Sequence, residues 1–247
     1  MESIENLKTN WKKAHVLHLA EHFHEFNTTN KQHARVRKYT LNAEAIKSIQ
    51  NKWSNIKEMG IYLGLRENNT NENIITFAPI FTIKTTETLS FEMHVQTESV
   101  ENRKGANMQS AFVPQPYVDM VTDNWNTIDF HLIDDLFIVK NKANPERVLS
   151  YHITENIIEQ LAQLKGDNLL AINLYLGVDM NKFHKAKLPS FVPVYGFEFK
   201  EATNDIVKFF QALTGYRGSD TSKIQEIFVQ YSSPCPPTCE PYIPPNS

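Results

Sequence analysis

The two halves of the chain resemble each other when one is displaced by about 113 residues along the other. Arg35-Val36-x-x-Tyr39 corresponds to Arg147-Val148-x-x-Tyr151. The same order continues in five further pairs: Asn10-Trp11 with Asn124-Trp125, His18-Leu19 with His131-Leu132, 61–65 with 174–178, Phe77-x-Pro79 with Phe191-x-Pro193, and 92–99 with 226–233. The displacement grows to 134 in the last pair, because the second half carries extra residues near 201–220. Collinear self-similarity predicts two related copies of one structural unit, and the alternative is chance similarity between short amphipathic strands.

This repeat sets the expected domain organisation. The first copy spans 1–114, the second spans 115–233, and 234–247 is a tail. With 247 residues, 41% of them hydrophobic, the chain is long enough and apolar enough to bury a sizeable core. Six of the twelve prolines fall within 234–245, so the tail is expected to be extended and irregular.

Each copy is expected to be an α+β unit. Apolar residues alternate with period two in 59–65 and 170–178, which predicts half-buried strands. The other expected strands are 35–40, 74–84, 89–96, 147–152, 190–199 and 224–231, and the expected helices are 3–26, 43–53, 124–139, 155–165 and 202–214, with 100–123 as a connector.

The order of these elements indicates a topology. After its leading helix, the second copy has the order β-α-β-β-α-β, which resembles a ferredoxin-like unit. Two such units in one chain favour an intramolecular pseudo-dimer. Within each copy, a tyrosine and a glycine share one strand face, Tyr62 with Gly64 and Tyr175 with Gly177, which predicts close approach of a neighbouring helix.

Composition narrows the classes of function. The 25 Lys and Arg nearly balance the 28 Asp and Glu, so nucleic acid is not an expected partner, and the basic residues near Arg35 and Arg37 are expected to be a solvated surface. The sequence has no signal-peptide pattern and no run of 18 apolar residues, which favours a soluble, cytoplasmic protein away from membranes. Its eight glycines form none of the phosphate-binding loops, and no nucleophile elbow or kinase signature occurs.

The histidines of the first expected helix are the strongest chemical candidate. His18-Leu19-Ala20-Glu21-His22 has the pattern H-x-x-E-H, which resembles the motif of the inverted zinc metalloproteases. The resemblance covers five residues. It implies His18 and His22 as zinc ligands, Glu21 as the general base, and a third carboxylate ligand some tens of residues later, at Glu98 or Glu101.

Other interpretations of these histidines stay open. In an α-helix, His15, His18 and His22 would lie within about 60° of one another, so they could share a structural or adventitious metal. They could also be packed at the edge of a buried face, because Trp11 and Leu19 fall on the same stripe. The second half keeps only one of the two motif histidines, as His131.

Cys235 and Cys239 are the second candidate, in the proline-rich tail. A C-x-x-x-C pair could contribute two thiolates to a metal or close a small disulfide, although a complete zinc site needs further ligands. The alternatives are two reduced thiols, or a tail whose extended backbone docks on a partner.

No candidate constellation occurs in both copies. The expected function is therefore a non-enzymatic binding or assembly module with a protein partner. The alternative is a zinc-dependent hydrolase built on His18, Glu21 and His22, so the sequence leaves open whether the protein is an enzyme.

Overall fold

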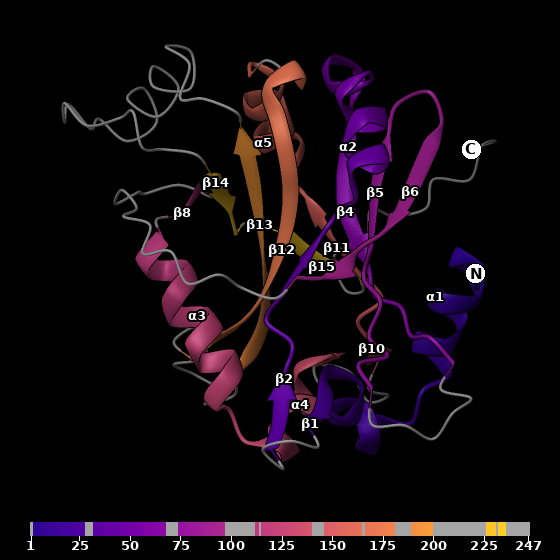
Figure 1. The fold of residues 1–247 in the computed structure, drawn as a ribbon, viewed down its shortest axis with the longest axis vertical. Helices are drawn as coiled ribbons and strands as arrows, with labels where there is room; N and C mark the ends of the chain where they lie inside the picture. Colours follow the sequence, from indigo (N-terminus) through magenta and orange to yellow (C-terminus); the bar gives the residue numbers. More distant parts are fainter. Residues whose placement is uncertain are drawn as a thin grey trace.

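The fold is mixed α+β, with two large antiparallel sheets at its centre (Figure 1). A computed structural model describes residues 2–27, 32–67, 74–96, 112–113, 115–139, 146–164, 166–180, 189–199, 226–230 and 232–235. The expected helix 202–214 lies outside these residues.

The five-stranded sheet has the order β15-β11-β4-β5-β6, and the six-stranded sheet has the order β7-β3-β12-β13-β14-β8. The strands of the first are β15 (Ser232–Cys235), β11 (Ser150–Ile153), β4 (Glu58–Tyr62), β5 (Ile80–Lys84) and β6 (Thr88–Glu92). Those of the second are β7 (His94–Val95), β3 (Lys38–Thr40), β12 (Leu169–Asp179), β13 (Ser190–Phe199), β14 (Glu226–Val229) and β8 (Phe112–Val113). Two small ladders join β1 (His24–Asn27) to β2 (Gln32–Arg35), and β9 (Ile138–Val139) to β10 (Glu146–Arg147).

Helices cover the sheets on several sides. They are α1 (Ile4–Lys13), α2 (Ala43–Gln50), α3 (Gln115–Thr127), α4 (Phe130–Leu136) and α5 (Glu155–Ala162), with 3₁₀ turns η1 (Val16–Phe23), η2 (Trp53–Asn55) and η3 (Gly166–Asn168). In Figure 1, α1 and α3 lie on opposite sides of the molecule, and α2 and α5 lie at one end. Ser3 and Asn42 begin α1 and α2, because each side chain accepts a hydrogen bond from a main-chain N–H in the first turn.

Close helix approach is observed at two of the glycines. A Cβ added at Gly64 would lie 3.1 Å from Leu7 Cβ of α1, and one added at Gly177 would lie 2.7 Å from Val121 Cγ2 of α3. Glycine is therefore needed at Gly177 of β12 for α3 to pack this closely, whereas at Gly64, which follows β4, an added Cβ would first meet the Ala78 carbonyl oxygen at 2.6 Å.

Each large sheet contains strands from both halves of the sequence. β3 of the first half pairs with β12, with Tyr39 opposite Leu174. β11 of the second half pairs with β4, with Tyr151 opposite Ile61. The main core lies between the sheets, where the Tyr195 hydroxyl donates to the Tyr151 carbonyl oxygen at 3.1 Å.

This pairing is not the expected ferredoxin-like topology. In that fold the four strands of one copy share a sheet, and the first strand pairs with the third and fourth. Here β11 lies in the other sheet, and β12, β13 and β14 are consecutive antiparallel neighbours. The predicted match of 92–99 with 226–233 is also displaced. Phe81 and Tyr195 are equivalent positions in the repeat, and their strand partners are Phe91 and Val229. The sequence match, in contrast, aligns Val95 with Val229.

Two tryptophans connect the halves through contacts of the same form. Trp11 Nε1 donates to the Val148 carbonyl oxygen at 2.9 Å, and Trp125 Nε1 donates to the Val36 carbonyl oxygen at 2.7 Å. Both indoles are fully buried. Arg147 donates to the Trp11 carbonyl oxygen and Arg35 to that of Trp125. Each guanidinium thus satisfies a carbonyl at the end of a helix from the other half.

Several predicted boundaries were wrong. The expected helix 3–26 is divided into α1, η1 and β1, because α1 ends at Lys13. The expected connector 100–123 contains the start of α3 at Gln115, and the expected helix 124–139 is the end of α3, then α4 and β9. Pro234 and Cys235, expected in an irregular tail, are the last residues of β15.

Candidate functional site

A groove of about 750 Å³ opens beside η1 and is lined by residues from both halves. The second half contributes Asn126 of α3 and Phe130 of α4. The lining residues of the first half are Glu21 of η1, His24 of β1, Ala34 and Arg35 of β2, and Arg37, which follows β2. In Figure 1 these elements meet at the end of the molecule opposite α2 and α5.

Arg35 holds the walls of the groove together. Its Nε donates to His24 Nε2 at 2.8 Å, and its terminal nitrogens donate to the carbonyl oxygens of Trp125 and Ile128. Burial lowers the pKa of Arg35 from its usual value, and the carboxylate of Asp129 opposes that shift. Since most of its N–H groups are already engaged, Arg35 is mainly a structural cation.

The hydrogen bonds of His24 fix its tautomer. Nδ1 lies 2.7 Å from the Ala20 carbonyl oxygen, which can only accept, so Nδ1 carries a proton. Nε2 faces the Nε–H of Arg35, which can only donate, so Nε2 carries none. His24 is therefore a neutral imidazole with both nitrogens engaged, and the ring of Phe130 lies 5.2 Å from it.

Two hydrogen-bond donors of the groove have no partner within the described part of the chain. Arg37 is exposed, while its carbonyl oxygen accepts from the Leu176 N–H at 2.9 Å and fixes its main chain to the six-stranded sheet. The Nδ2 of Asn126 is buried without a hydrogen bond. Phe130 adds an aromatic surface, 42% exposed, and Glu21 lies exposed at the rim.

These groups favour a ligand rich in hydrogen-bond acceptors. The exposed Arg37 supplies N–H groups to carboxylate or carbonyl oxygens, and a guanidinium can bind a carboxylate through two hydrogen bonds. Asn126 lines the same groove, and its buried Nδ2 reaches a ligand when the side chain turns toward the groove. The Phe130 ring offers an apolar surface next to those donors. Among the residues that the structure describes, the lining contains no Ser, Cys, Thr or Lys, so none of these residues offers a hydroxyl, thiol or amine nucleophile.

The H-x-x-E-H residues lie beside the groove, but on a 3₁₀ helix. At three residues per turn, His18 and Glu21 are eclipsed, whereas His22 is turned away by about 120°. Accordingly His18 Nδ1 lies 3.4 Å from Glu21 Oε1, and His22 Nδ1 is hydrogen-bonded to Thr76 Oγ1 at 2.7 Å. Burial lowers the pKa of His22. The arrangement differs from the α-helical one that the motif requires.

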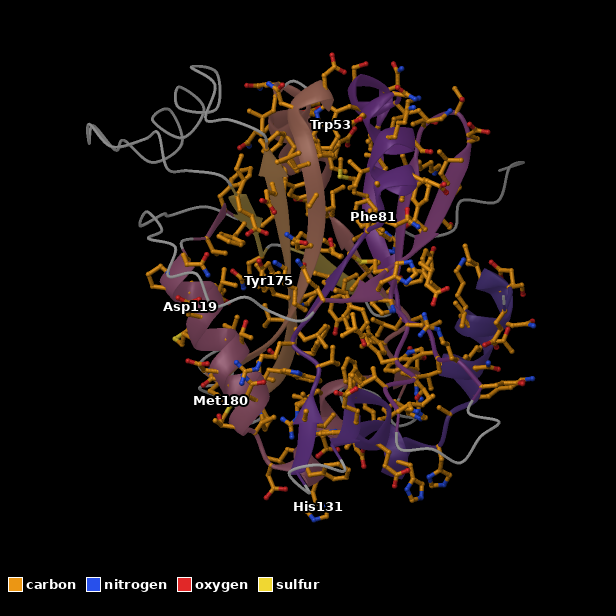
Figure 2. The ribbon with its side chains drawn as sticks, in the orientation of Figure 1. Trp53, Phe81, Asp119, His131, Tyr175 and Met180 are labelled. Carbon is orange, nitrogen blue, oxygen red and sulfur yellow. The ribbon has the colours of Figure 1, made fainter. Side chains whose placement is uncertain are left out.

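The remaining predicted ligands are not brought to this segment by any described contact. Glu98, Glu101 and Cys239 lie outside the described residues, and Cys235 is in β15 at the edge of the five-stranded sheet. His131 lies on α4, at the lower end of the molecule in Figure 2. Within the described ranges, no group of three His, Cys, Asp or Glu residues is placed to hold a metal ion.

Metal content checks this arrangement. We expect tag-free protein to contain only substoichiometric zinc by mass spectrometry, with His22→Ala giving the same value, because His22 is bound to Thr76 and turned away from His18. A protein ending before Pro234 serves as the control for the cysteine pair. One zinc per chain that disappears in His22→Ala would instead support the zinc hydrolase.

The sequence analysis missed a buried polar cluster on the α3 side of the six-stranded sheet. Asn173 Nδ2 donates to Glu226 Oε1 at 2.7 Å, the Tyr175 hydroxyl lies 3.0 and 3.1 Å from the two carboxylate oxygens, and Lys38 Nζ lies 4.7 Å from the centre of the Tyr175 ring. Figure 2 shows Tyr175 between β12 and α3. The available signal was a polar residue, Asn173, within an apolar strand pattern. These contacts hold β12 to β14.

No protein-family model matches the chain, and the comparisons with curated proteins and with solved structures give no significant match. No helix in the described residues is long and apolar enough to span a membrane.

Proposed function

We propose that the protein is a non-enzymatic binding module whose groove captures an acidic segment of a protein partner. The observation that carries the proposal is the pair of donors, Arg37 and Asn126, which lie beside the exposed ring of Phe130 without partners among the described residues. A buried N–H without an acceptor is costly, so a ligand that supplies a carboxylate or carbonyl oxygen gains affinity there.

We further propose that the two halves are related copies that form an intramolecular pseudo-dimer. The exchanged strands β3 and β11 and the matched contacts of Trp11 and Trp125 support this interpretation. The two copies differ at the groove. The displacement of 112 residues that relates Arg35 to Arg147 also relates Arg37 to Leu149, so the second half has a leucine at the position of this arginine. Only one of the two corresponding surfaces therefore carries this cation, and we expect one ligand per chain.

Peptide selection tests the groove. We would select phage-displayed dodecapeptides on the protein and counter-select on Arg37→Glu. Enriched peptides are expected to place Asp or Glu next to an apolar residue, since the carboxylate meets Arg37 and Asn126 while the apolar side chain meets Phe130. Their affinity, measured by titration calorimetry, is expected to fall at least about tenfold in Arg37→Glu, because a charge-assisted hydrogen bond contributes about 1.5–3 kcal/mol.

Lys47→Glu is the matched control, since it makes the same change of charge at an exposed residue of α2, at the opposite end of the molecule. It should leave affinity within about twofold, because exposed charges beyond about 10 Å are screened at physiological salt. Equal losses in both variants would indicate a general charge effect, and no loss in Arg37→Glu would contradict the proposed site.

A further inference from the structure

The outer edge of the five-stranded sheet at β6 is open among the described strands. β6 pairs only with β5, with Phe91 opposite Phe81 and Leu89 opposite Ile83. It contains no proline, and its two apolar side chains are only partly buried against the main core. An edge strand with free main-chain N–H and C=O groups is a template for a further strand.

The hydrogen-bond pattern identifies which groups point outward. Met93 N–H donates to the Pro79 carbonyl oxygen and Thr85 N–H donates to that of Glu87, at 2.9 Å each. Hydrogen-bonded positions alternate along an antiparallel ladder, so the odd-numbered residues from 87 to 93 bond to β5. The main-chain groups of Thr88, Ser90 and Glu92 therefore point away from the sheet.

The other large sheet shows what such an edge accepts. There β14 pairs with β13 on one side and with the short strand β8 on the other, with Phe228 opposite Val113. β14 and β6 hold equivalent places in the two sheets, because Val229 of β14 lies opposite Tyr195 and Phe91 of β6 lies opposite Phe81. In the six-stranded sheet β8 lies beside β14, whereas no described strand lies at the equivalent place beside β6.

The sequence of β6 is complementary to itself in antiparallel pairing. With Ser90 opposite Ser90 of a second copy, Leu89 lies opposite Phe91 on the core side, and Thr88 lies opposite Glu92 on the outer side. Apolar residues then meet apolar residues, and no like charges face each other. The three outward residues of each strand can exchange about six main-chain hydrogen bonds.

We propose that β6 is a self-association edge, through which two copies of the chain join their five-stranded sheets into one continuous antiparallel sheet. The contact is centred on Ser90 and related by a two-fold axis, as in other isologous interfaces. Its small size places it among weak, reversible interfaces. The groove at Arg37 is not part of this edge, so a failure of either proposal leaves the other intact.

Two substitutions at one exposed residue test the register. Thr88→Glu places a carboxylate opposite Glu92 of the second copy at two symmetric positions, whereas Thr88→Lys places an ammonium group there. The ion pair of Glu92 with Arg66 of its own chain reduces both effects, and a thermal midpoint for each variant controls for the new contact with Lys84, which lies opposite residue 88 in the hairpin. Sedimentation equilibrium of the full chain up to about 500 µM measures the dimer dissociation constant. We expect Thr88→Lys to lower it by about fivefold and Thr88→Glu to raise it by about fivefold, and added salt should reduce both changes.

Ser90→Pro tests the main-chain hydrogen bonds. Proline removes an N–H that points away from β5, so the hairpin keeps its internal hydrogen bonds, and an edge strand accepts proline at such a position. We expect a monomer with a thermal midpoint close to that of the wild type, while Ser90→Ala still dimerises. A wild-type protein that stays monomeric over the whole range would overturn the proposal, as would equal dissociation constants for Thr88→Glu and Thr88→Lys.

Discussion

Trp125→Ala is expected to lower the free energy of unfolding by about 4 kcal/mol, and Trp11→Ala by a similar amount. Trp125 is fully buried, and its ring packs edge-on against Phe23 at 5.1 Å and Phe191 at 5.8 Å. Its indole N–H also satisfies the Val36 carbonyl oxygen. Alanine would leave both a cavity and an unpaired carbonyl between the two halves.

Trp125→Phe separates the two contributions. Phenylalanine keeps most of the apolar volume but removes the donor, so we expect a loss of about 1–2 kcal/mol. Urea unfolding followed by far-UV circular dichroism measures each variant, because tryptophan fluorescence changes with the substitution itself. A loss below about 1 kcal/mol for Trp125→Ala would mean that this indole does not anchor the halves.

Separating the halves is expected to abolish folding. We expect fragments 1–114 and 115–247 to be unfolded or aggregated when expressed alone, and to form a soluble one-to-one complex when expressed together. Alone, the first fragment would lack β11 beside β4 and the Val148 carbonyl oxygen for Trp11. The second fragment would lack β3 beside β12, which exposes an edge of the six-stranded sheet.

Circular dichroism and size-exclusion chromatography with light scattering distinguish the outcomes. A complex that forms only on co-expression is the expected result. Two separate fragments that each unfold cooperatively would show that the halves are independent domains, and the strand exchange would then not be required for folding.

Two of the expected strands were predicted well, whereas the expected strand 59–65, which has the same period-two pattern as 170–178, is β4 only up to Tyr62. The expected strands 170–178 and 190–199 are β12 and β13 within one residue at each end, and the expected helices 43–53 and 155–165 contain α2 and α5. The half-burial expected for 170–178 was wrong, because every residue of β12 from Ile172 to Asp179 is buried and both faces of the strand are covered. Alternation also does not show which strand lies beside another. The patterns of β3 and β11 are compatible with pairing inside one half or across the two, so the exchange could not be predicted.

Tertiary contacts also explain the wrong helix at 3–26. Its apolar stripe is real, since Trp11, Leu19 and Phe23 are fully buried. However, the Ala20 N–H donates to Asp134 of α4, and the His22 carbonyl oxygen accepts from the N–H groups of Thr76 and Phe77. These partners are distant in sequence, so local periodicity cannot reveal them.

The groove was hidden for the same reason. The sequence placed Arg35 and Arg37 in a solvated basic patch, and it singled out Glu21 as a metalloprotease base. Asn126 and Phe130, which complete the groove, come from the other half of the chain and match no motif. The pairing of β3 with β12 and the hydrogen bonds of Arg35 to Trp125 and Ile128 bring them next to Arg37.

Heteronuclear NMR of the protein titrated with a selected acidic peptide tests the proposed function most directly. The side-chain N–H₂ of Asn126 and the Nε–H of Arg37 should shift on binding, since both are donors toward the ligand. The side-chain amide of Gln50, which donates to the Leu169 carbonyl oxygen at the far end of the molecule, should not shift. Shifts that leave Asn126 and Arg37 unchanged would contradict the proposed binding site.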